Sequence, residues 1–409
     1  MANDLNFREV ASLREENERR EQRLQQIRQK QTKRRVKNIG RLVAVITALA
    51  LAAVIGQAVL GPVRLSPLND TWRLMGRAGD GFPVDFSYSH TRQAALVGNS
   101  IALLGPTQFD ILNNRGYRSV ELTQPYPLPS LRAAGNRVAL FDRESGRLTL
   151  FSRTQTLYYL ELEQGIFVVD INARGDLAVA TRSDRATSEI IVYGANQRRQ
   201  LHWLCEHEYP SALRLNNNGS SLGMCLIGME QAGVYSRFVD FPLGAAAPRT
   251  DLRIEGVWLY DAATIAGGWL AVSDQAMYVI HHGATTPQIM SYEGRGLMHF
   301  SMQNNGYSAI VLEDWDNRAL LRIYDRRGNL AFEHSFEQRP LSVHALGRRV
   351  YLHFGDVLVR WQRGTFRQSQ PLPSGTQQVL VSGRGVYLLG VRQVEHMQMR
   401  WSEAEELNQ

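Results

Sequence analysis

The chain has 409 residues, enough for one large domain or two ordinary ones, and 44% of them are hydrophobic, which excludes a wholly disordered chain. Its formal charge of +7 is concentrated at the N-terminus, where residues 1–41 hold twelve Lys and Arg against six acidic residues. The rest of the chain therefore carries a net charge of about +1, too little for the basic surface of a nucleic-acid-binding domain. The sequence predicts no nucleic-acid partner.

Residues 1–41 are predicted to form a basic cytoplasmic helix, because this segment is rich in Glu, Arg and Gln and contains Gly only near its end. Apolar positions repeat at alternating spacings of three and four residues, but Asn17 and Arg20 interrupt the centre of this seam. Two interpretations remain open: a helix solvated beside anionic lipid, or a weak parallel coiled coil through which the protein self-associates.

Residues 42–61 are predicted to form one transmembrane helix. The run from Leu42 to Leu60 carries no charge, and its nineteen residues cover roughly 28 Å as a helix, close to the thickness of the hydrocarbon core of a bilayer. The sequence Gly56-Gln57-Ala58 resembles a signal-peptide cleavage site, but the apolar run is longer than signal peptides use. A retained anchor is therefore favoured over a cleaved signal peptide and over a buried core helix, which would show a polar face.

The orientation of this helix follows from the charges beside it. Five basic residues lie at positions 33–41, whereas Arg64 is the nearest one beyond the helix. Positive residues are retained in the cytoplasm, so the N-terminus is predicted to be cytoplasmic. Residues 62–81 then form a linker, residues 82–402 an extracytoplasmic domain, and residues 403–409 a tail.

A glycine followed by a short apolar run recurs through the extracytoplasmic domain. In most of these units a small residue lies three or four places after the glycine, which we expect to pack near a crowded central axis. The intervals between the glycines are 36 to 49 residues. The glycines are Gly98, Gly135, Gly175, Gly219, Gly268, Gly306, Gly347 and Gly383.

Each unit contains room for four short strands joined by tight turns, as in Arg322–Leu330, where Gly328 allows the turn. Four strands in about forty residues are typical of one blade of a β-propeller. The last unit is short, so the segments 84–88 and 94–97 are expected to complete it and close the ring. The sequence thus predicts an all-β fold, a β-propeller with eight blades; seven blades, and a pair of β-sandwiches, are the alternatives.

This layout resembles bacterial membrane-anchored propellers of the WD40 and quinoprotein-like kind, and in particular a single-pass family with a domain of unknown function. The resemblance covers residues 40–400 through its pattern of repeats. The Gly-His and Trp-Asp markers of WD40 blades do not recur, and Trp315-Asp316 occurs once and out of phase. The resemblance therefore implies an anchored propeller and no particular activity.

No catalytic motif is recognisable, so catalytic residues stay unassigned, and no cofactor and no metal site are predicted. His281-His282 is interpreted as a hairpin tip, because adjacent strand residues point to opposite faces. The acidic run 313–317 lacks the glycine and distal glutamate of a calcium loop and is interpreted as a solvated turn.

Two cysteines, Cys205 and Cys225, occur in the whole chain. Both lie in apolar strand patterns and are interpreted as small buried residues, with a disulfide between them as the alternative in an oxidising compartment. Four aromatic residues follow strand alternation and are assigned to the core, although a ring of such residues at a propeller mouth would form a ligand platform. They are Trp258, Tyr260, Trp269 and Tyr278.

The function predicted on these grounds is a membrane-tethered binding or scaffolding module for a cell-envelope protein or a glycan. The alternative is an enzyme, a hydrolase or quinoprotein-like, with a site in the axial pocket of the propeller. Convergent ionisable side chains along the central channel would favour the enzyme, and a face of aromatic and mixed charged residues would favour the binding module.

Overall fold

The computed structural model of the protein describes residues 45, 47, 63, 64, 66–86, 88, 90–383 and 385–404. The chain divides into two compact units, 1–61 and 62–409, and the second holds nearly all of these residues. Among the described residues, no helix is both long enough and apolar enough to cross a membrane. Three segments lie outside the described part of the chain: the predicted cytoplasmic helix at 1–41, the last five residues, and the predicted span at 42–61 except residues 45 and 47.

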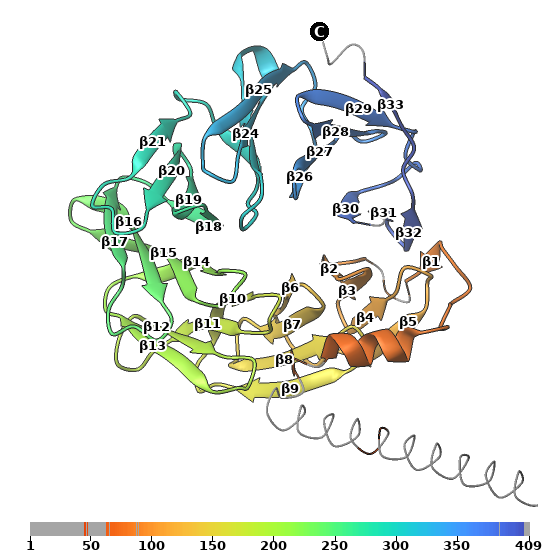
Figure 1. Cartoon of the computed structure of the whole chain (residues 1–409), viewed down its shortest axis with the longest axis horizontal. Helices are drawn as coiled ribbons and strands as arrows, with labels where there is room; N and C mark the ends of the chain where they lie inside the picture. Colours follow the sequence, from red (N-terminus) through yellow and green to blue (C-terminus); the bar gives the residue numbers. More distant parts are fainter. Residues whose placement is uncertain are drawn as a thin grey trace, which may run out of the picture. The chain divides into compact units, whose positions relative to one another are not determined.

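The second unit is an eight-bladed β-propeller, as the repeats predict, and the sandwich alternative is wrong (Figure 1). Each blade is an antiparallel sheet whose first strand is innermost. The first four blades contain β2 (Gln93–Val97), β3 (Ser100–Leu104), β4 (Gln108–Leu112) and β5 (Arg118–Thr123); β6 (Pro129–Ala134), β7 (Arg137–Asp142), β8 (Arg147–Ser152) and β9 (Thr156–Glu161); β10 (Ile166–Ile171), β11 (Leu177–Arg182), β12 (Ser188–Tyr193) and β13 (Arg199–Cys205); and β14 (Tyr209–Leu215), β15 (Ser221–Glu230), β16 (Gly233–Pro242) and β17 (Thr250–Glu255).

The other four blades complete the ring. They contain β18 (Leu259–Ile265), β19 (Gly268–Ser273), β20 (Ala276–His281) and β21 (Gln288–Ser291); β22 (Leu297–Ser301), β23 (Ser308–Glu313), β24 (Ala319–Tyr324) and β25 (Leu330–Phe336); β26 (Ser342–Leu346), β27 (Arg349–His353), β28 (Leu358–Gln362), β29 (Thr365–Ser369) and β33 (Trp401–Glu403); and β30 (Gln378–Ser382), β31 (Gly385–Leu389), β32 (Gln393–Met397) and β1 (Val84–Asp85).

The apolar runs after the recurring glycines form the second strand of each blade, and these strands are buried on both sides. Every residue of β3 and of β7 is buried, because the neighbouring blades cover both faces of the sheet. The small residues Ala102, Ala139 and Ala178 are 0% exposed, so their predicted burial is confirmed. Their expected position beside the axis is wrong, because the first strand of each blade lies between them and the channel.

The ring closes through the N-terminal strand. β1 pairs with β32 in the register Val84↔Val394, so a segment from the start of the domain completes the last blade. The predicted contribution of 94–97 to that blade is wrong: these residues belong to β2, the innermost strand of the first blade. The last blade supplies three strands of its own, which leaves one position to fill, and β33 instead extends the preceding blade by pairing with β29.

A short helix precedes the propeller. Residues 63, 64 and 66–74 are helical and are called the cap helix here. Its Asp70 is 0% exposed and accepts hydrogen bonds from Ser152 Oγ and Thr154 Oγ1, both at 2.7 Å. The guanidinium of Arg137 donates to the carbonyl of Val63, so the start and the middle of the cap helix are bound to the propeller.

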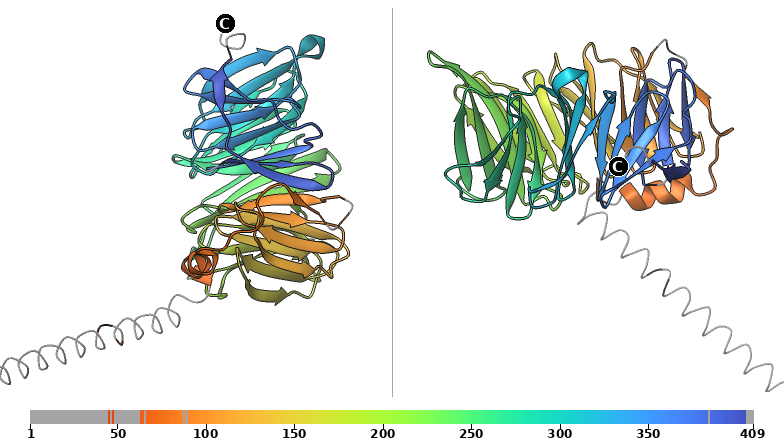
Figure 2. Two further views of the ribbon diagram at one scale, coloured as in Figure 1. Left: turned by 90° about the vertical axis from the view of Figure 1, so that its right-hand side faces the viewer. Right: turned by 90° about the horizontal axis from the view of Figure 1, so that it is seen from above.

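The strands alternate in direction, so the propeller has two faces with different connections. Turns between first and second strands and between third and fourth strands lie on one face, together with the cap helix, whose contacts are with such turns (Figure 2). This face is called the helix face. The remaining turns and the connections between blades lie on the opposite face, called the mouth face.

The propeller contains its own core. Eight hydrophobic clusters fill the spaces between neighbouring blades, and the described residues of every cluster lie at position 63 or later. Residues 62–409 are therefore a self-contained folding unit.

Candidate functional site

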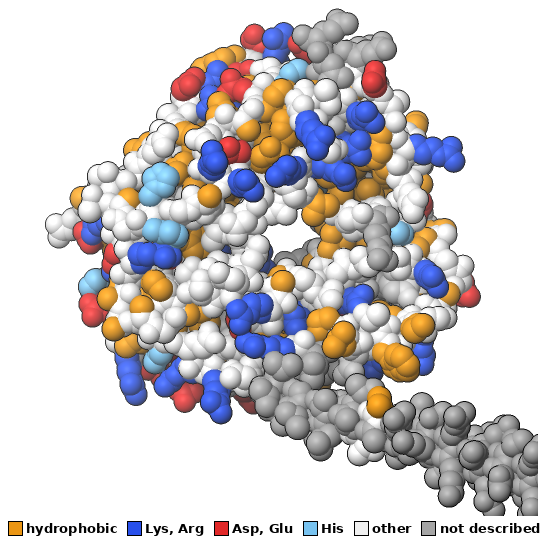
Figure 3. All heavy atoms as spheres, viewed as in Figure 1, with side chains coloured by type: hydrophobic (Ala, Val, Ile, Leu, Met, Phe, Trp, Pro, Cys, Tyr) orange, Lys and Arg blue, Asp and Glu red, His pale blue; other side chains and the backbone are white. Residues whose placement is uncertain are grey.

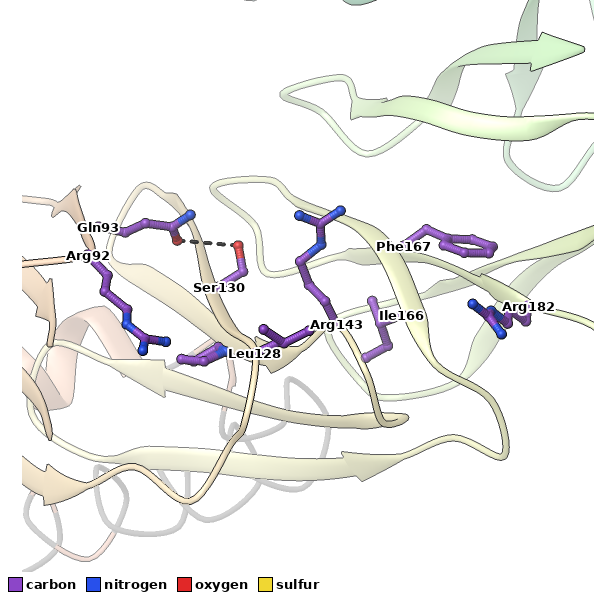
Figure 4. Close-up of a pocket in the computed structure, with 9 residues that line it drawn as sticks. Arg92, Gln93, Leu128, Ser130, Arg143, Ile166, Phe167 and Arg182 are labelled. Atoms are coloured by element: carbon purple, nitrogen blue, oxygen red, sulfur yellow. Dashed lines mark hydrogen bonds between the residues drawn. The ribbon is translucent and has the colours of Figure 1, made fainter. Parts of the chain in front are cut away.

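A pocket of about 530 Å³ opens on the mouth face between the first three blades (Figure 4). Three arginines line it, one from each blade: Arg92 precedes β2, Arg143 follows β7, and Arg182 ends β11. The apolar side chains of Leu128 and Phe167 complete its walls. We call this site the arginine pocket.

The guanidinium groups of this pocket are available to a ligand. All three side chains are exposed, and none of them makes an ion pair or a side-chain hydrogen bond with another described residue. By contrast, Arg295 on the same face is paired and binds both Glu293 and Asp314. Three unpaired guanidiniums in one concave site favour an anionic ligand, because arginine donates parallel hydrogen bonds to carboxylate and phosphate groups.

The floor of the arginine pocket is fixed by contacts between two blades. The Oε1 atom of Gln93 accepts hydrogen bonds from the backbone N–H of Leu131 at 2.7 Å and from Ser130 Oγ at 3.3 Å. Figure 4 shows the bond between Gln93 and Ser130 beside the three arginines. These bonds hold the first strands of the two blades in place, so the pocket is present without a ligand.

Aromatic residues continue from the arginine pocket along the first strands of the next blades. Phe167 of β10 contacts Tyr209 of β14 edge to face at 5.5 Å, and Tyr260 of β18 stacks on Phe300 of β22 at 6.3 Å. We call these four residues the aromatic arc. Tyr209, Tyr260 and Phe300 are 55%, 39% and 37% exposed, so their rings are accessible to a ligand.

Two aromatic residues near this arc differ from the prediction from sequence. Trp258 and Tyr260 are expected in the core but are 45% and 39% exposed, because they alternate with buried neighbours such as Leu259 and so lie on the exposed side of this segment. Trp269 and Tyr278 are buried as predicted, at 0% and 3% exposure.

A chain of ion pairs crosses the first strands of four blades at the axis. Nε of Arg132 donates to Oδ1 of Asp170 at 2.8 Å, and Nη1 of Arg214 lies 3.5 Å from the same oxygen. Nε of Arg214 also donates to Oδ1 of Asp261 at 2.6 Å, and its Nη2 contacts the other carboxylate oxygen. We call these four residues the axial network.

The carboxylates of the axial network are buried and paired. Burial raises the pKa of Asp170, and burial raises the pKa of Asp261 to about 7. The charge of Arg132 and a hydrogen bond from the backbone N–H of Ala262 lower the pKa of Asp261 and so oppose this rise. Because each carboxylate already accepts guanidinium bonds, the network stabilises contacts between blades and leaves no carboxylate free to act as a general base.

The two cysteines lie apart. Cys205 packs in the cluster between the third and fourth blades, and Cys225 packs in the cluster between the fourth and fifth. Both are free, buried thiols, and the structure does not bring them together as a disulfide. Burial raises the pKa of Cys205 to about 11 and the pKa of Cys225 well above its ordinary value, so neither thiol is activated as a nucleophile.

The polar motifs considered from sequence have structural partners. His281 ends β20 and His282 occupies the following turn, as the hairpin interpretation predicts; Nδ1 of His282 lies 2.9 Å from Asp240 Oδ2. In the acidic run, Glu313 and Asp314 pair with Arg339 and Arg295. Among the residues that the structure describes, no group of three or more His, Cys, Asp or Glu could hold a metal ion.

Sequence reasoning did not identify Arg92, Arg143 or Arg182 as a site. One signal was available: Arg143 and Arg182 come at or just after the end of the second strand in consecutive blades, five or six places after the strand begins. Residues at equivalent positions of neighbouring blades meet at one face, so a repeat alignment would have placed these two side by side.

Comparison with known proteins extends the description of the fold. A model of a family of unknown function (DUF5711) matches residues 121–353. The C-terminal WD40 domain of Sif2 is similar in structure, with a TM-score of 0.52 and 11% identity over 79% of this chain and 99% of that one. Comparison of the sequence with curated proteins gives no match.

Two further solved structures have comparable similarity. One is a eukaryotic initiation factor, with a TM-score of 0.51 and 12% identity over 81% of this chain and 92% of that one. The other is the dihydro-heme d1 dehydrogenase NirN in complex with DHE, with a TM-score of 0.51 and 12% identity over 82% and 84%. The resemblance to WD40 and quinoprotein-like propellers is therefore confirmed for the fold, and at this identity for the fold alone.

Proposed function

Since the chain belongs to the DUF5711 family, whose function is unknown, its family assigns it no activity, and we propose that it is a binding or scaffolding module. The site of binding is the arginine pocket, and its ligand is an anionic group on a cell-envelope protein or glycan. The observation that carries this proposal is the presence of three unpaired arginines from three blades in one concave site.

The neighbouring aromatic arc supports a binding role. Exposed rings of Tyr and Phe offer large rigid surfaces to a sugar or a peptide, while the arginines supply charge-assisted hydrogen bonds. A site of this kind, rigid and concave with a few polar groups, suits recognition. The axial network would favour the alternative of an enzyme, but its ionisable groups are engaged with one another.

We also propose that the propeller is tethered to the membrane by residues 42–61, with its C-terminal domain extracytoplasmic. The absence of charge from 42 to 60 and the basic residues before it support this orientation. The cap helix begins at residue 63 on the helix face, so a tether ending at residue 61 would leave the arginine pocket on the face away from its attachment.

The proposed topology predicts different accessibility for the two ends of the chain. With one epitope tag before Met1 and another after Gln409, protease added to intact spheroplasts should remove the second tag and spare the first. Lysed spheroplasts, in which both tags are accessible, serve as the control. Protection of the C-terminal tag in intact spheroplasts would contradict the proposed orientation.

The proposed binding site predicts that three substitutions abolish partner capture. The variant Arg92→Ser, Arg143→Ser, Arg182→Ser of residues 62–409 should lose the partners that the wild-type unit retains from native envelope extracts. Loss of a charge-assisted hydrogen bond costs roughly 1.5–3 kcal/mol, so each substitution should weaken binding about tenfold or more. The measurement is quantitative pull-down followed by titration of the recovered partner.

A matched control changes three arginines that do not line the pocket. Arg185, Arg199 and Arg392 are also exposed, so their joint replacement by Ser removes the same charge. This control should capture partners as the wild type does, and both variants should keep the wild-type thermal midpoint. Equal capture by the pocket variant, or equal loss in the control, would refute the assignment of the site.

A further inference from the structure

The cap helix has one side bound to the propeller and the other side free. Val63, Ser66 and Asp70, spaced by three and four residues, are each 0% exposed. The bound side is fixed mainly by polar contacts, since Asp70 accepts bonds from Ser152 and Thr154.

The free side carries large apolar residues. Leu68 and Trp72 on the cap helix and Met75 in the turn that follows it are 72%, 79% and 76% exposed. They follow one another at spacings of four and three, so they form one stripe directed away from the propeller. Burial of Asp70 against the propeller, with Leu and Trp outside, reverses the usual arrangement of a surface helix. An exposed apolar stripe of this kind is typical of a surface that binds another protein or a membrane.

The helix face around this stripe is basic. Six arginines in its turns are exposed and make no ion pair with a described residue: Arg115, Arg198, Arg326, Arg327, Arg348 and Arg363. The described turns of this face hold two acidic residues, of which Asp176 is buried and Asp325 accepts the backbone N–H groups of Arg327 and Asn329. The segment between the cap helix and β1, where the N–H of Gly79 donates to the carbonyl of Arg115, adds one exposed acidic residue, Asp80. Figure 3 looks onto this face and shows Arg side chains gathered around the central opening.

The mouth face has the opposite character. Its described turns and connections carry eleven Asp and Glu residues against seven Arg, so a unit with a net charge of about +1 has its acidic excess on this face. A positive face with an apolar stripe is complementary to a surface of negative charge over an apolar interior.

We propose that the helix face docks on the surface of a membrane that contains anionic lipids. Leu68, Trp72 and Met75 enter the region between headgroups and acyl chains, where tryptophan is favoured, and the arginines bind lipid phosphates. Arginine suits this role because its planar guanidinium pairs with phosphate through two hydrogen bonds. The proposed tether ends two residues before the cap helix, which would hold this face close to the bilayer.

Vesicle co-sedimentation of residues 62–409 tests this docking without the proposed tether. The unit should pellet with vesicles of phosphatidylcholine and phosphatidylglycerol, more weakly with phosphatidylcholine alone, and less as salt is raised. The variant Leu68→Ser, Trp72→Ser, Met75→Ser should lose affinity roughly tenfold or more, because it removes the apolar area that would be buried.

The control removes equally exposed apolar residues elsewhere. Tyr159, Met229 and Ile289 are 76%, 76% and 59% exposed on β9, β15 and β21, and their replacement by Ser should leave sedimentation unchanged. The variant of the arginine pocket should also sediment normally, so this proposal and the proposed function fail separately.

A second measurement uses the full chain reconstituted in vesicles with brominated acyl chains. Trp72 should be quenched, so the wild type should lose more fluorescence than Trp72→Phe. The proposal would be overturned if the unit did not sediment with the mixed vesicles, or if the control variant lost as much binding as the stripe variant. It would also be overturned if the stripe mediated self-association in place of vesicle binding, or if the wild type and Trp72→Phe were quenched equally.

Discussion

Truncation of residues 62–409 after Ser382 is expected to abolish cooperative folding of the propeller. The deletion removes β31, β32 and β33 and leaves β1 without its partner strand. It also removes Val386, Tyr387, Leu388 and Leu389, all at most 3% exposed, from the clusters that pack against the neighbouring blades. Burial of such side chains stabilises a protein by about 1.5–3 kcal/mol each, so the loss is comparable with the whole stability of a typical domain.

The truncated chain would leave β30 and β1 without partner strands and β29 without β33, so strand edges that are paired in the whole domain become free. Such edges pair with other chains, so aggregation should accompany the loss of a sharp thermal transition. Truncation after Ala404 is the matched control, because it keeps every strand. A chain ending at Ser382 that stays monomeric and melts as sharply as this control would contradict closure of the ring through β1.

Substitution of Arg214 by Ala is expected to destabilise the propeller by about 3–5 kcal/mol, the cost of breaking a buried ion pair from one side. Asp261 would lose both guanidinium bonds, and Asp170 would lose one of its two cationic neighbours. Both carboxylates are nearly buried, at 7% and 3% exposure, so water cannot replace these bonds. Urea unfolding of residues 62–409 measures the effect.

The pH dependence of the Arg214→Ala variant gives a second readout. Burial already raises the pKa of Asp261 to about 7. Removal of Arg214 takes away two guanidinium bonds to this carboxylate, which favour its ionised form, so the pKa should rise further. When the pKa of Asp261 is higher in the folded than in the unfolded state, the folded state binds a proton that the unfolded state has released. The free energy of unfolding therefore falls as pH rises from the unfolded-state pKa to the folded-state pKa. The variant should therefore lose more stability, relative to the wild type, at pH 8 than at pH 5.

A double substitution separates the lost pair from a general disturbance. Arg214→Met with Asp261→Leu removes the charges together and should recover most of the stability, since apolar residues of similar volume can replace a buried pair. If Arg214→Ala costs less than about 1 kcal/mol, the axial network contributes little to stability.

The sequence determined the architecture of this protein to a large extent. The spacing of Gly98, Gly135 and the later glycines, each before an apolar run, predicted eight units of four strands, and the structure has eight blades. This pattern is local: a turn residue and a strand buried on both sides leave their mark within a few neighbouring positions.

Contacts between distant segments could not be predicted in the same way. The sequence indicated that an N-terminal segment closes the ring, but not that residues 84–85 alone do so. Residues 94–97 have an equally suitable strand pattern. Which of the two segments joins the last blade depends on how many strand positions that blade leaves open. The exposure of Tyr260 likewise depends on which side of β18 a neighbouring blade covers: strand alternation places Trp258 and Tyr260 on one side, but the sequence does not show that this side is the exposed one.

The candidate site and the polarity of the molecule were decided by the tertiary structure alone. Arg92, Arg143 and Arg182 are separated by 51 and 39 positions in the chain and meet because successive blades present equivalent residues at one face. The net charge of the chain beyond residue 41 is only about +1, but the structure separates it into a basic helix face and a mouth face with more acidic than basic residues. Successive turns of an antiparallel meander lie at opposite ends of its strands, so charges that alternate along the chain become separated in space.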